Sequence, residues 1–358
     1  MPMMFFTQSE DCSSPRVTHI MHNVFVTGAT GFIGRHLTDA LVESCCEVRC
    51  LVRSPQRAAH LKRDGVRLVE GSLADTARWQ SALSGCDTVF HLGGLVAARS
   101  RTELFAVNGD AVGEFTDACA ATGSPPRFVH VSSLAAAGPV PHGRDIRDES
   151  DPLQPVSLYG QSKLAGEIQL RQRADRLPIT ILRPAIVFGE HDTKVAAMFQ
   201  MIHLMHLHLT WFRDGPLSLI HVADLVDLLL AAADRGECIS PSTSASHDGQ
   251  GAYNACDDRV HPTYAELGRR IAASLNRSVL VLPLPLLLAM PTSFAIEAFW
   301  NLLGQASIVS PDKLREATAG SWAASSRKAR NELNFAPVAT LDERLRQTAA
   351  WLHDHNQL

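Results

Sequence analysis

Residues 23–34 read NVFVTGATGFIG, and this stretch decides the fold. Its first residues form a run of β-branched and aromatic side chains, which is typical of a buried strand. Gly28, Gly31 and Gly34 follow, and the apolar residues after them recur at helical spacing. Glycine is needed where the chain turns tightly and lets a phosphate approach the amides that open a helix. The stretch therefore predicts a strand, a glycine-rich turn and a helix that together can hold a phosphate-containing ligand.

Short β-branched runs continue to alternate with helix-compatible stretches from this point to about Arg183. Strands are predicted at residues 24–26, 48–52, 66–69, 88–92, 128–132 and 179–182. This alternation predicts an α/β fold, a Rossmann-type doubly wound parallel sheet with a smaller C-terminal substrate lobe. Ligands bind such sheets outside the carboxyl ends of the strands, so we expect the glycine turn, Arg53, Ser133 and Arg183 to converge there.

The domain organisation follows from where the alternation begins and weakens. We expect residues 1–20 to be a flexible tail and residues 21–183 to form the dinucleotide-binding Rossmann domain. Segments 215–235 and 252–256 are predicted to return to that domain, whereas 184–214 and 257–358 form the substrate-binding lobe. Within these segments the pattern predicts a helix over 194–209, a strand over 217–222 and a helix over 223–233.

Three side chains carry the expected chemistry. Tyr159 and Lys163 are four residues apart and share a helix face, and Ser133 ends a predicted strand. A tyrosine has a pKa near 10, and a nearby ammonium lowers that pKa by favouring the phenolate. A serine hydroxyl can donate to a substrate oxygen. Each residue alone also fits a structural or solvated role, but together they predict proton transfer coupled to hydride transfer between a nicotinamide and an alcohol or carbonyl.

The motifs VTGATGFIG, VFHLGG, VHVSSLAAAG, YGQSK and ILRPAIVFG occur in this order, and matches continue to the C-terminus. In this the chain resembles the extended short-chain dehydrogenases/reductases, which include NAD(P)-dependent sugar epimerases, 3β-hydroxysteroid dehydrogenases and dihydroflavonol reductases. The resemblance implies that Tyr159 is the acid/base, that Lys163 holds the cofactor ribose and that Ser133 contacts the substrate oxygen. It also implies that Asn108 is a structural bridge in the helix after the fourth strand.

The resemblance further implies a nicotinamide cofactor that lies across several strand ends. The expected cofactor-binding residues are Gly28, Thr30, Gly31, Phe32, Ile33, Arg53, Ser72, Leu73, Leu92, Gly93, Gly94, Lys163, Pro184, Ile186 and Val187. Ser72 stands where the family often has aspartate. Arg53 follows the second strand, where an acidic residue would select NAD, and a guanidinium there suits a 2′-phosphate. NADP is therefore the expected cofactor, with NAD as the alternative.

The leading expectation is an NADP-dependent enzyme that interconverts a secondary alcohol and a ketone on a largely apolar, steroid-, flavonoid- or acyl-like small molecule. Segments 138–157 and 199–209, and the apolar stretch after Pro283, are predicted to roof the pocket with few charges. A nucleotide-sugar 4-epimerase is the alternative, and a non-catalytic NADP-sensing protein is a third reading. Leu134 and Ala135 after Ser133 argue against dehydration, because dehydratases of the family carry an acidic pair there.

Composition and charge limit the possible binding partners of the protein and its cellular location. The net charge of −4 gives no general attraction to nucleic acid. No cysteine pair has C-x-x-C spacing, so we expect reduced thiols and a cytoplasmic protein. His203, His206 and His208 invite a metal hypothesis, but their spacing does not bring all three to one helix face, and no metal is predicted. The sequence leaves open peripheral membrane contact through residues 280–303 and a homodimer.

Overall fold

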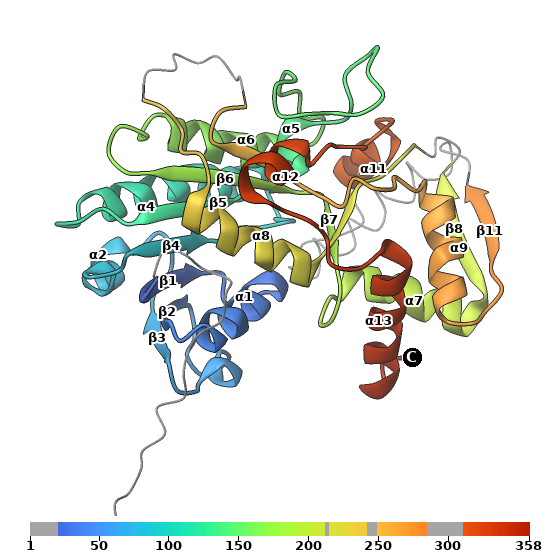
Figure 1. Ribbon diagram of the computed structural model, residues 1–358, viewed down its shortest axis with the longest axis horizontal. Coiled ribbons are helices and arrows are strands. Elements are labelled where there is room, and N and C mark those ends of the chain that lie inside the picture. The colour runs from blue at the N-terminus through green and yellow to red at the C-terminus, as the bar shows by residue number, and fades with distance from the viewer. Residues whose placement is uncertain (1–20, 212–214, 242–248, 285–310) are drawn as a thin grey trace, which may run out of the picture.

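The computed structural model describes residues 21–211, 215–241, 249–284 and 311–358. At its centre is a sheet of seven parallel strands in the order β10-β6-β5-β4-β1-β2-β3 (Figure 1). These strands are β1 (Asn23–Thr27), β2 (Glu47–Val52), β3 (Val66–Glu70), β4 (Thr88–His91), β5 (Arg127–Val131), β6 (Ile179–Pro184) and β10 (Ala252–Ala255). The first six agree with the predicted runs to within two residues at each end, and the predicted α/β class is confirmed.

Helices cover both faces of the sheet because successive side chains of each strand point to opposite sides. Val24 and Val26 of β1 belong to a core shared with α1 (Phe32–Glu43), α8 (Val222–Arg235) and α12 (Arg327–Leu333). Phe25, which lies between them, belongs to a second core. That core includes residues of α2 (Thr76–Trp79), α4 (Ala111–Ala120) and α6 (Leu158–Arg171). The continuous apolar run in β1 is therefore the signature of a strand buried on both sides.

The winding of the sheet reverses between two central strands. β1 pairs with β2 on one side and with β4 on the other, so the carboxyl ends of β1 and β4 are neighbours. This is the topological switch point at which ligands bind in open α/β sheets. The turns after the two strands are packed together: a Cβ on Gly28, whose φ is +74°, would lie 2.8 Å from the amide nitrogen of Gly93. Only glycine fits this position.

A third core lies in the C-terminal part of the chain. It is formed by residues of α7 (Lys194–Met205), α9 (Tyr264–Ser274) and α13 (Leu341–Asp354). Two small parallel pairs accompany these helices, β7 (Ile186–Phe188) with β9 (Leu219–His221) and β8 (Leu207–Trp211) with β11 (Leu280–Leu284). Figure 1 shows α7, α9 and the β8–β11 pair together at one end of the molecule, away from β1–β3. Within the described residues, the other α-helices are α3 (Arg101–Phe105), α5 (Leu134–Ala137) and α11 (Pro311–Thr318).

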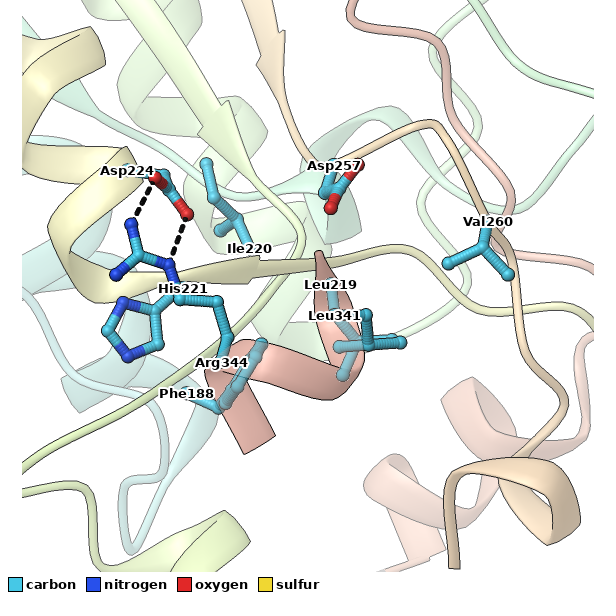
Figure 2. A pocket seen from close by; sticks show the side chains of 9 residues that line it. All are labelled: Phe188, Leu219, Ile220, His221, Asp224, Asp257, Val260, Leu341 and Arg344. Carbon is cyan, nitrogen blue, oxygen red and sulfur yellow. Dashed lines mark hydrogen bonds and ion pairs between the residues drawn. The ribbon is translucent and has the colours of Figure 1, made fainter. Parts of the chain in front are cut away.

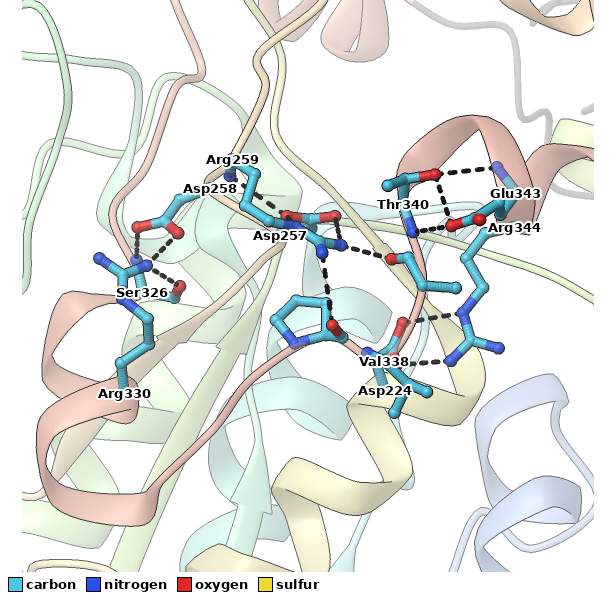
Figure 3. Close-up of polar contacts among 12 residues, drawn as sticks. Asp224, Asp257, Asp258, Arg259, Ser326, Arg330, Val338, Thr340, Glu343 and Arg344 are labelled. Atoms are coloured by element: carbon cyan, nitrogen blue, oxygen red, sulfur yellow. Dashed lines mark hydrogen bonds and ion pairs between the residues drawn. The ribbon is translucent and has the colours of Figure 1, made fainter.

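Buried and half-buried ion pairs fasten the C-terminal segment to the sheet domain. Arg344 of α13 pairs with Asp224 of α8 at 2.6 Å, and the amide of Val338 also donates to Asp224 (Figure 3). Nearby, Arg330 of α12 pairs with Asp258, just beyond β10. Figure 2 shows a small hollow beside the Asp224–Arg344 pair, with a volume of about 10 Å³. That is room for about one water molecule, so this hollow is a packing defect of the joint between the two parts.

The predicted helix over 194–209 is wrong in its last four residues. Helix α7 ends at Met205, and His206 adopts a left-handed conformation with a φ of +52°. Residues 207–211 then extend as β8 because they pair with β11, more than 70 residues later in the chain. The apolar spacing of the segment suits a helix, but pairing with a distant strand overrides that local preference.

Two segments for which the sequence made predictions are described only in part or not at all. The predicted flexible tail, residues 1–20, lies outside the described residues, as does most of segment 280–303, of which only β11 is described.

Cys45 forms a disulfide, so the expectation of reduced thiols is wrong for this residue. The other described cysteines carry free thiols: Cys46, Cys50, Cys86, Cys119, Cys238 and Cys256. No helix within the described ranges is long and apolar enough to cross a membrane.

Candidate active site

A large cavity of about 670 Å³ lies at the carboxyl edge of the sheet. It begins at the glycine turn after β1, passes the ends of β4 and β5, and reaches the start of α6 and the C-terminal lobe. The predicted site residues that line it are Gly28, Gly31, Phe32, Ile33, Leu92, Gly94, Ser133, Tyr159, Lys163, Pro184, Ile186 and Val187. Its volume is in the range of small-molecule binding sites, about 300–1,000 Å³.

The other five predicted cofactor residues are not among the described residues that line this cavity. Thr30 and Arg53 are exposed, Arg53 directly after the last residue of β2. The carbonyl of Ser72 accepts a hydrogen bond from the Trp79 indole at 2.7 Å. The amide of Gly93 donates to Thr27, and the side chain of Leu73 packs against Gly93. Thr30, Arg53, Ser72, Leu73 and Gly93 therefore lie at or behind the rim of the cavity.

The turn after β1 has the donors that a pyrophosphate needs. Gly31 is the N-cap of α1 and has no side chain to accept from the first amides of the helix, those of Phe32 and Ile33. A Cβ on Gly34 would lie 2.2 Å from the carbonyl oxygen of Gly28, so the helix can approach the turn only with glycine there. The exposed amides and the positive end of α1 thus face the cavity, and they fit the phosphates of a dinucleotide.

Ser133, Tyr159 and Lys163 meet on the opposite wall of the cavity. Ser133 is the N-cap of α5, directly beyond β5, and it lies close enough to Tyr159 to lower the pKa of the phenol. Lys163 follows one turn after Tyr159 on α6, is almost fully buried, and donates from Nζ to the carbonyl of Val131 at 2.8 Å. A serine hydroxyl at the start of α5 and a phenol and an ammonium on α6 are therefore placed around one space.

The pKa of Tyr159 differs from the prediction. Burial raises the pKa of this phenol to about 12; the hydrogen bond from Ser133 lowers it, and the carboxylate of Glu316 raises it further. Burial also lowers the pKa of Lys163 to about 8, against the opposing effect of Glu167. The expectation that Lys163 brings the phenol pKa below its usual value is therefore wrong in this structure, because desolvation dominates and Nζ is directed to the Val131 carbonyl.

Asn108 connects the cavity wall to α6. It lies in a short π-helical segment, Ala106–Asp110, and its side-chain amide donates to the carbonyl of Leu95 and to the hydroxyl of Ser162. Its side-chain oxygen accepts from the amide of Leu95 at 2.8 Å. Insertions of this kind are common where a helix must redirect a side chain at a functional site. Here the insertion turns Asn108 so that it bridges the loop after β4 and the residue preceding Lys163.

Arg183 does not face the cavity as expected. Its guanidinium is buried and binds the carboxylate of Glu167 through Nε at 3.0 Å and Nη2 at 2.6 Å. Ser132 donates to the same carboxylate at 2.6 Å. This network joins β6, α6 and the end of β5, so it fixes the register of the elements that carry Ser133, Tyr159 and Lys163.

The roof of the cavity comes from segments that sequence reasoning missed. Of the described residues, none from 138–157 or 199–209 lines it, and the segment after Pro283 lies largely outside the described part. The lining residues of the C-terminal lobe and of the approach to α7 include Asp192, Lys194, Leu217, Tyr264, Lys313, Glu316 and Trp322. The expectation of few charges is therefore corrected too: two lysines and two carboxylates, besides Lys163, face the cavity.

The three histidines of the MIHLMHLHL run have separate surroundings. His203 lies in α7, His206 contacts the carbonyl of Ser278, and His208 is buried against Tyr264. Within the described ranges, no group of three or more histidine, cysteine or carboxylate residues is arranged to hold a metal ion.

Comparison with known proteins agrees with this architecture. Residues 24–243, more than half of the chain, match the model of the NAD dependent epimerase/dehydratase family. In overall structure the chain resembles a UDP-glucose 4-epimerase from Thermotoga maritima, solved with UDP-glucose. The TM-score is 0.73 at 20% identity, over 93% of this chain and 99% of that one, so this likeness concerns the fold alone.

Two relatives that are named as reductases have higher sequence identity to this chain. A 4-hydroxy-2-methyl-3-oxo-4-farnesyl-3,4-dihydroquinoline-1-oxide ketoreductase from Stigmatella aurantiaca is 32% identical over 220 residues. That match covers 59% of this chain and 64% of the relative, which is less than two thirds of its length. The ceramide reductase of Caulobacter vibrioides is 28% identical over 304 residues, which cover 85% of this chain and 86% of the relative.

Proposed function

Because this chain belongs to the NAD-dependent epimerase/dehydratase family of extended short-chain dehydrogenases/reductases, we propose that it is an oxidoreductase acting on a largely apolar small molecule. In this proposal it interconverts a secondary alcohol and a ketone with a nicotinamide cofactor. Reductase relatives with a farnesylated quinoline and a ceramide in their names support an apolar substrate.

One observation carries the proposal: Ser133, Tyr159 and Lys163 line the same cavity that begins at the glycine turn. The wall between the turn and these residues is largely apolar and includes Leu92, Leu95 and Val96. A dinucleotide with its phosphates at α1 can therefore extend toward the hydroxyl of Tyr159 within one continuous space. A pocket with an apolar wall and a few convergent polar groups is the usual form of a small-molecule site.

The roles of the side chains follow from their chemistry. A bound nicotinamide cofactor would supply or accept the hydride. Tyr159 would give its phenolic proton to the ketone oxygen during reduction and take it back from the alcohol during oxidation. Ser133 would donate a hydrogen bond to the same oxygen and stabilise the charge that develops on it. Lys163, which already lies near Gly94, would hold the ribose hydroxyls and orient the cofactor.

A binding panel tests the substrate class. With NADPH or NADP present, we expect steroids, acyl ketones or aryl ketones to raise the melting temperature, and nucleotide sugars to leave it unchanged. The gain should increase with apolar area, by at most about 25 cal/mol per Å² buried. Thermal-shift measurements, followed by turnover assays on the compounds that bind, give the answer. Stabilisation by a UDP- or dTDP-sugar, with none by any apolar carbonyl or alcohol, would contradict the proposal.

A nucleotide-sugar 4-epimerase remains the second candidate, and one feature of the cavity favours it. Lys194, at the first position of α7, faces the cavity, and no carboxylate of the described residues forms an ion pair with it. Burial and the positive charge of the nearby Lys313 lower the pKa of Lys194. A bound anion would reduce the repulsion between these two lysines. The diphosphate of a nucleotide sugar could supply that anion. An epimerase of this kind would also retain NAD through purification, which mass spectrometry of the purified protein can detect.

The cofactor proposal concerns Arg53. This residue is exposed directly after β2, the strand beside β1, where a 2′-phosphate on the adenosine ribose would lie. We propose NADP as the preferred cofactor and expect Arg53→Ala to weaken NADPH binding about ten- to hundredfold while NADH binding is unchanged. This is the loss of one hydrogen bond between charged groups, about 1.5–3 kcal/mol.

The control for this prediction is Arg67→Ala, which removes an equally exposed guanidinium from the neighbouring strand β3. The wild type and both variants are titrated calorimetrically with NADPH and NADH. If only Arg53→Ala weakens NADPH binding, the effect is a local contact and not a general loss of positive charge. Equal affinity of the wild-type protein for the two cofactors would count against NADP preference.

A further inference from the structure

The two-stranded sheet formed by β8 and β11 has its polar and apolar faces reversed. His208 and Thr210 of β8 are buried, and the ring of His208 packs against α9, 4.7 Å from the ring of Tyr264. Successive side chains of a strand point to opposite faces, so Leu207 and Leu209, which are only half-buried, point away from α9. A sheet with one covered face normally buries its apolar side chains and exposes its polar ones. Here the arrangement is the opposite.

The outward apolar face continues across β11. In the parallel register of the two strands, Leu207 lies beside Leu280. Two residues further along, Leu209 lies beside Leu282. Side chains at paired positions of neighbouring strands lie on the same face, so the four leucines form one apolar surface. Leu280 and Leu282 are 65% and 44% exposed, and Figure 1 shows the two strands at the outer edge of the molecule.

The last turn of α7 extends this apolar surface. The amide of Leu280 donates to the carbonyl of His206 at 2.8 Å, so β11 begins beside the residue that ends α7. Leu204 and Met205, the last two residues of the helix, are 74% and 65% exposed. Single exposed apolar side chains are common on protein surfaces, but a contiguous group marks an interaction site. This apolar tip consists of Leu204, Met205, Leu207, Leu209, Leu280 and Leu282.

The two chain segments that form the apolar tip contain basic residues and no acidic residue. No aspartate or glutamate occurs in residues 193–213 or 267–296, although the whole chain has a net charge of −4. Arg269 and Arg277 are exposed, and Arg277 lies three residues before Leu280. An apolar surface bordered by arginines fits a lipid bilayer with anionic headgroups, because the bilayer accepts the leucines and attracts the positive charge.

We propose that the apolar tip is a docking surface for an anionic lipid bilayer. A second copy of this chain fits the tip less well, because a twofold interface would bring Arg269 and Arg277 of both copies together. Helix α7 connects the tip to the cavity: its first two residues, Lys194 and Val195, line the cavity, and its last turn carries part of the tip. Docking would therefore bring the substrate-binding lobe to the bilayer, where apolar small molecules are concentrated.

Co-sedimentation of the full chain with lipid vesicles tests this proposal. One set of vesicles is phosphatidylcholine alone, and the other is equal parts of phosphatidylcholine and phosphatidylglycerol. We expect the wild-type protein to bind the mixed vesicles, and added salt to weaken that binding by screening the arginines. The double variant Leu204→Gln, Leu280→Gln should bind about tenfold more weakly or worse, because two leucines no longer enter the apolar layer. Arg277→Gln should weaken binding about fivefold.

Val338→Gln is the matched control, because Val338 is 77% exposed but lies outside the tip, beside Asp224. It should leave vesicle binding unchanged, and circular dichroism confirms that the variants remain folded. Three results would overturn the proposal: no binding to the mixed vesicles, equal binding to both kinds of vesicle, or an equal loss in Val338→Gln. A dimer that the double variant dissociates, without vesicle binding, would instead assign the tip to a second copy. The assay needs neither cofactor nor substrate, so its outcome is independent of whether the proposed activity is found.

Discussion

Replacing Tyr159 by phenylalanine should lower turnover on the true substrate by about a hundredfold or more while cofactor binding is retained. The variant keeps the aromatic ring under Lys313 but loses the hydroxyl of a residue that lines the cavity together with Ser133. A positioned acid contributes about 10²–10⁴ to the rate of such a step. Turnover is measured from nicotinamide absorbance, and cofactor affinity by calorimetric titration.

The control is Tyr264→Phe, since Tyr264 also lines the cavity and is half-buried. Its hydroxyl contacts the sulfur of Met198, so its loss should change turnover little. A wild-type rate in Tyr159→Phe would show that the proton comes from another group and that the assigned chemistry is wrong. Equal losses in the two variants would indicate a general effect on the cavity.

The largest expected effect on stability is at the buried ion pair between Glu167 and Arg183. Glu167→Gln should lower the free energy of unfolding by about 3–5 kcal/mol, because the Arg183 guanidinium would remain buried without its counter-charge. The side chains of Glu167 and Arg183 are 0% and 1% exposed, so water cannot replace the lost partner. Chemical denaturation monitored by fluorescence measures the change. Adding Arg183→Met to the variant should restore part of the loss, since it removes the unpaired charge.

An exposed pair of similar geometry gives the comparison. Glu70 and Arg78 are 3.0 Å apart, and their side chains are 50% and 55% exposed, so Glu70→Gln should cost less than about 1 kcal/mol. If both substitutions cost the same, burial does not determine the contribution of the Glu167–Arg183 pair.

The same pair predicts how stability depends on pH. Burial opposes ionisation of Glu167, but the Arg183 charge and the hydrogen bonds from Arg183 and Ser132 outweigh it and hold the pKa of Glu167 below its ordinary value. A carboxyl whose pKa is lower in the folded than in the unfolded protein stabilises the fold above the unfolded value, about 4.3. This contribution is lost as the pH falls through the folded pKa, so Glu167→Gln should flatten the acid side of the stability profile.

The sequence by itself determined the strands of the sheet, the glycine turn at one end of the cavity, and the Ser133, Tyr159 and Lys163 side chains at the other. Local signals were sufficient because each depends on neighbouring residues: the β-branched runs give β1 to β6, and the glycine spacing gives the turn before α1. Tyr159 and Lys163 share a helix face at fixed spacing, and Ser133 follows a strand end. Parallel topology then brings strand ends to one edge, so Gly28 and Ser133 were expected around one cavity, and the structure places them there.

Only the tertiary structure decided which side chains close that cavity and how they set its electrostatics. Lys313 and Glu316 lie more than 150 residues after Tyr159, on a short helix whose sequence is that of an ordinary amphipathic segment, and nothing local links them to the phenol. The same holds for β8, which becomes a strand only because β11 pairs with it. The pKa of Tyr159 likewise depends on burial and on the direction in which Lys163 is held, and both arise from packing between distant segments.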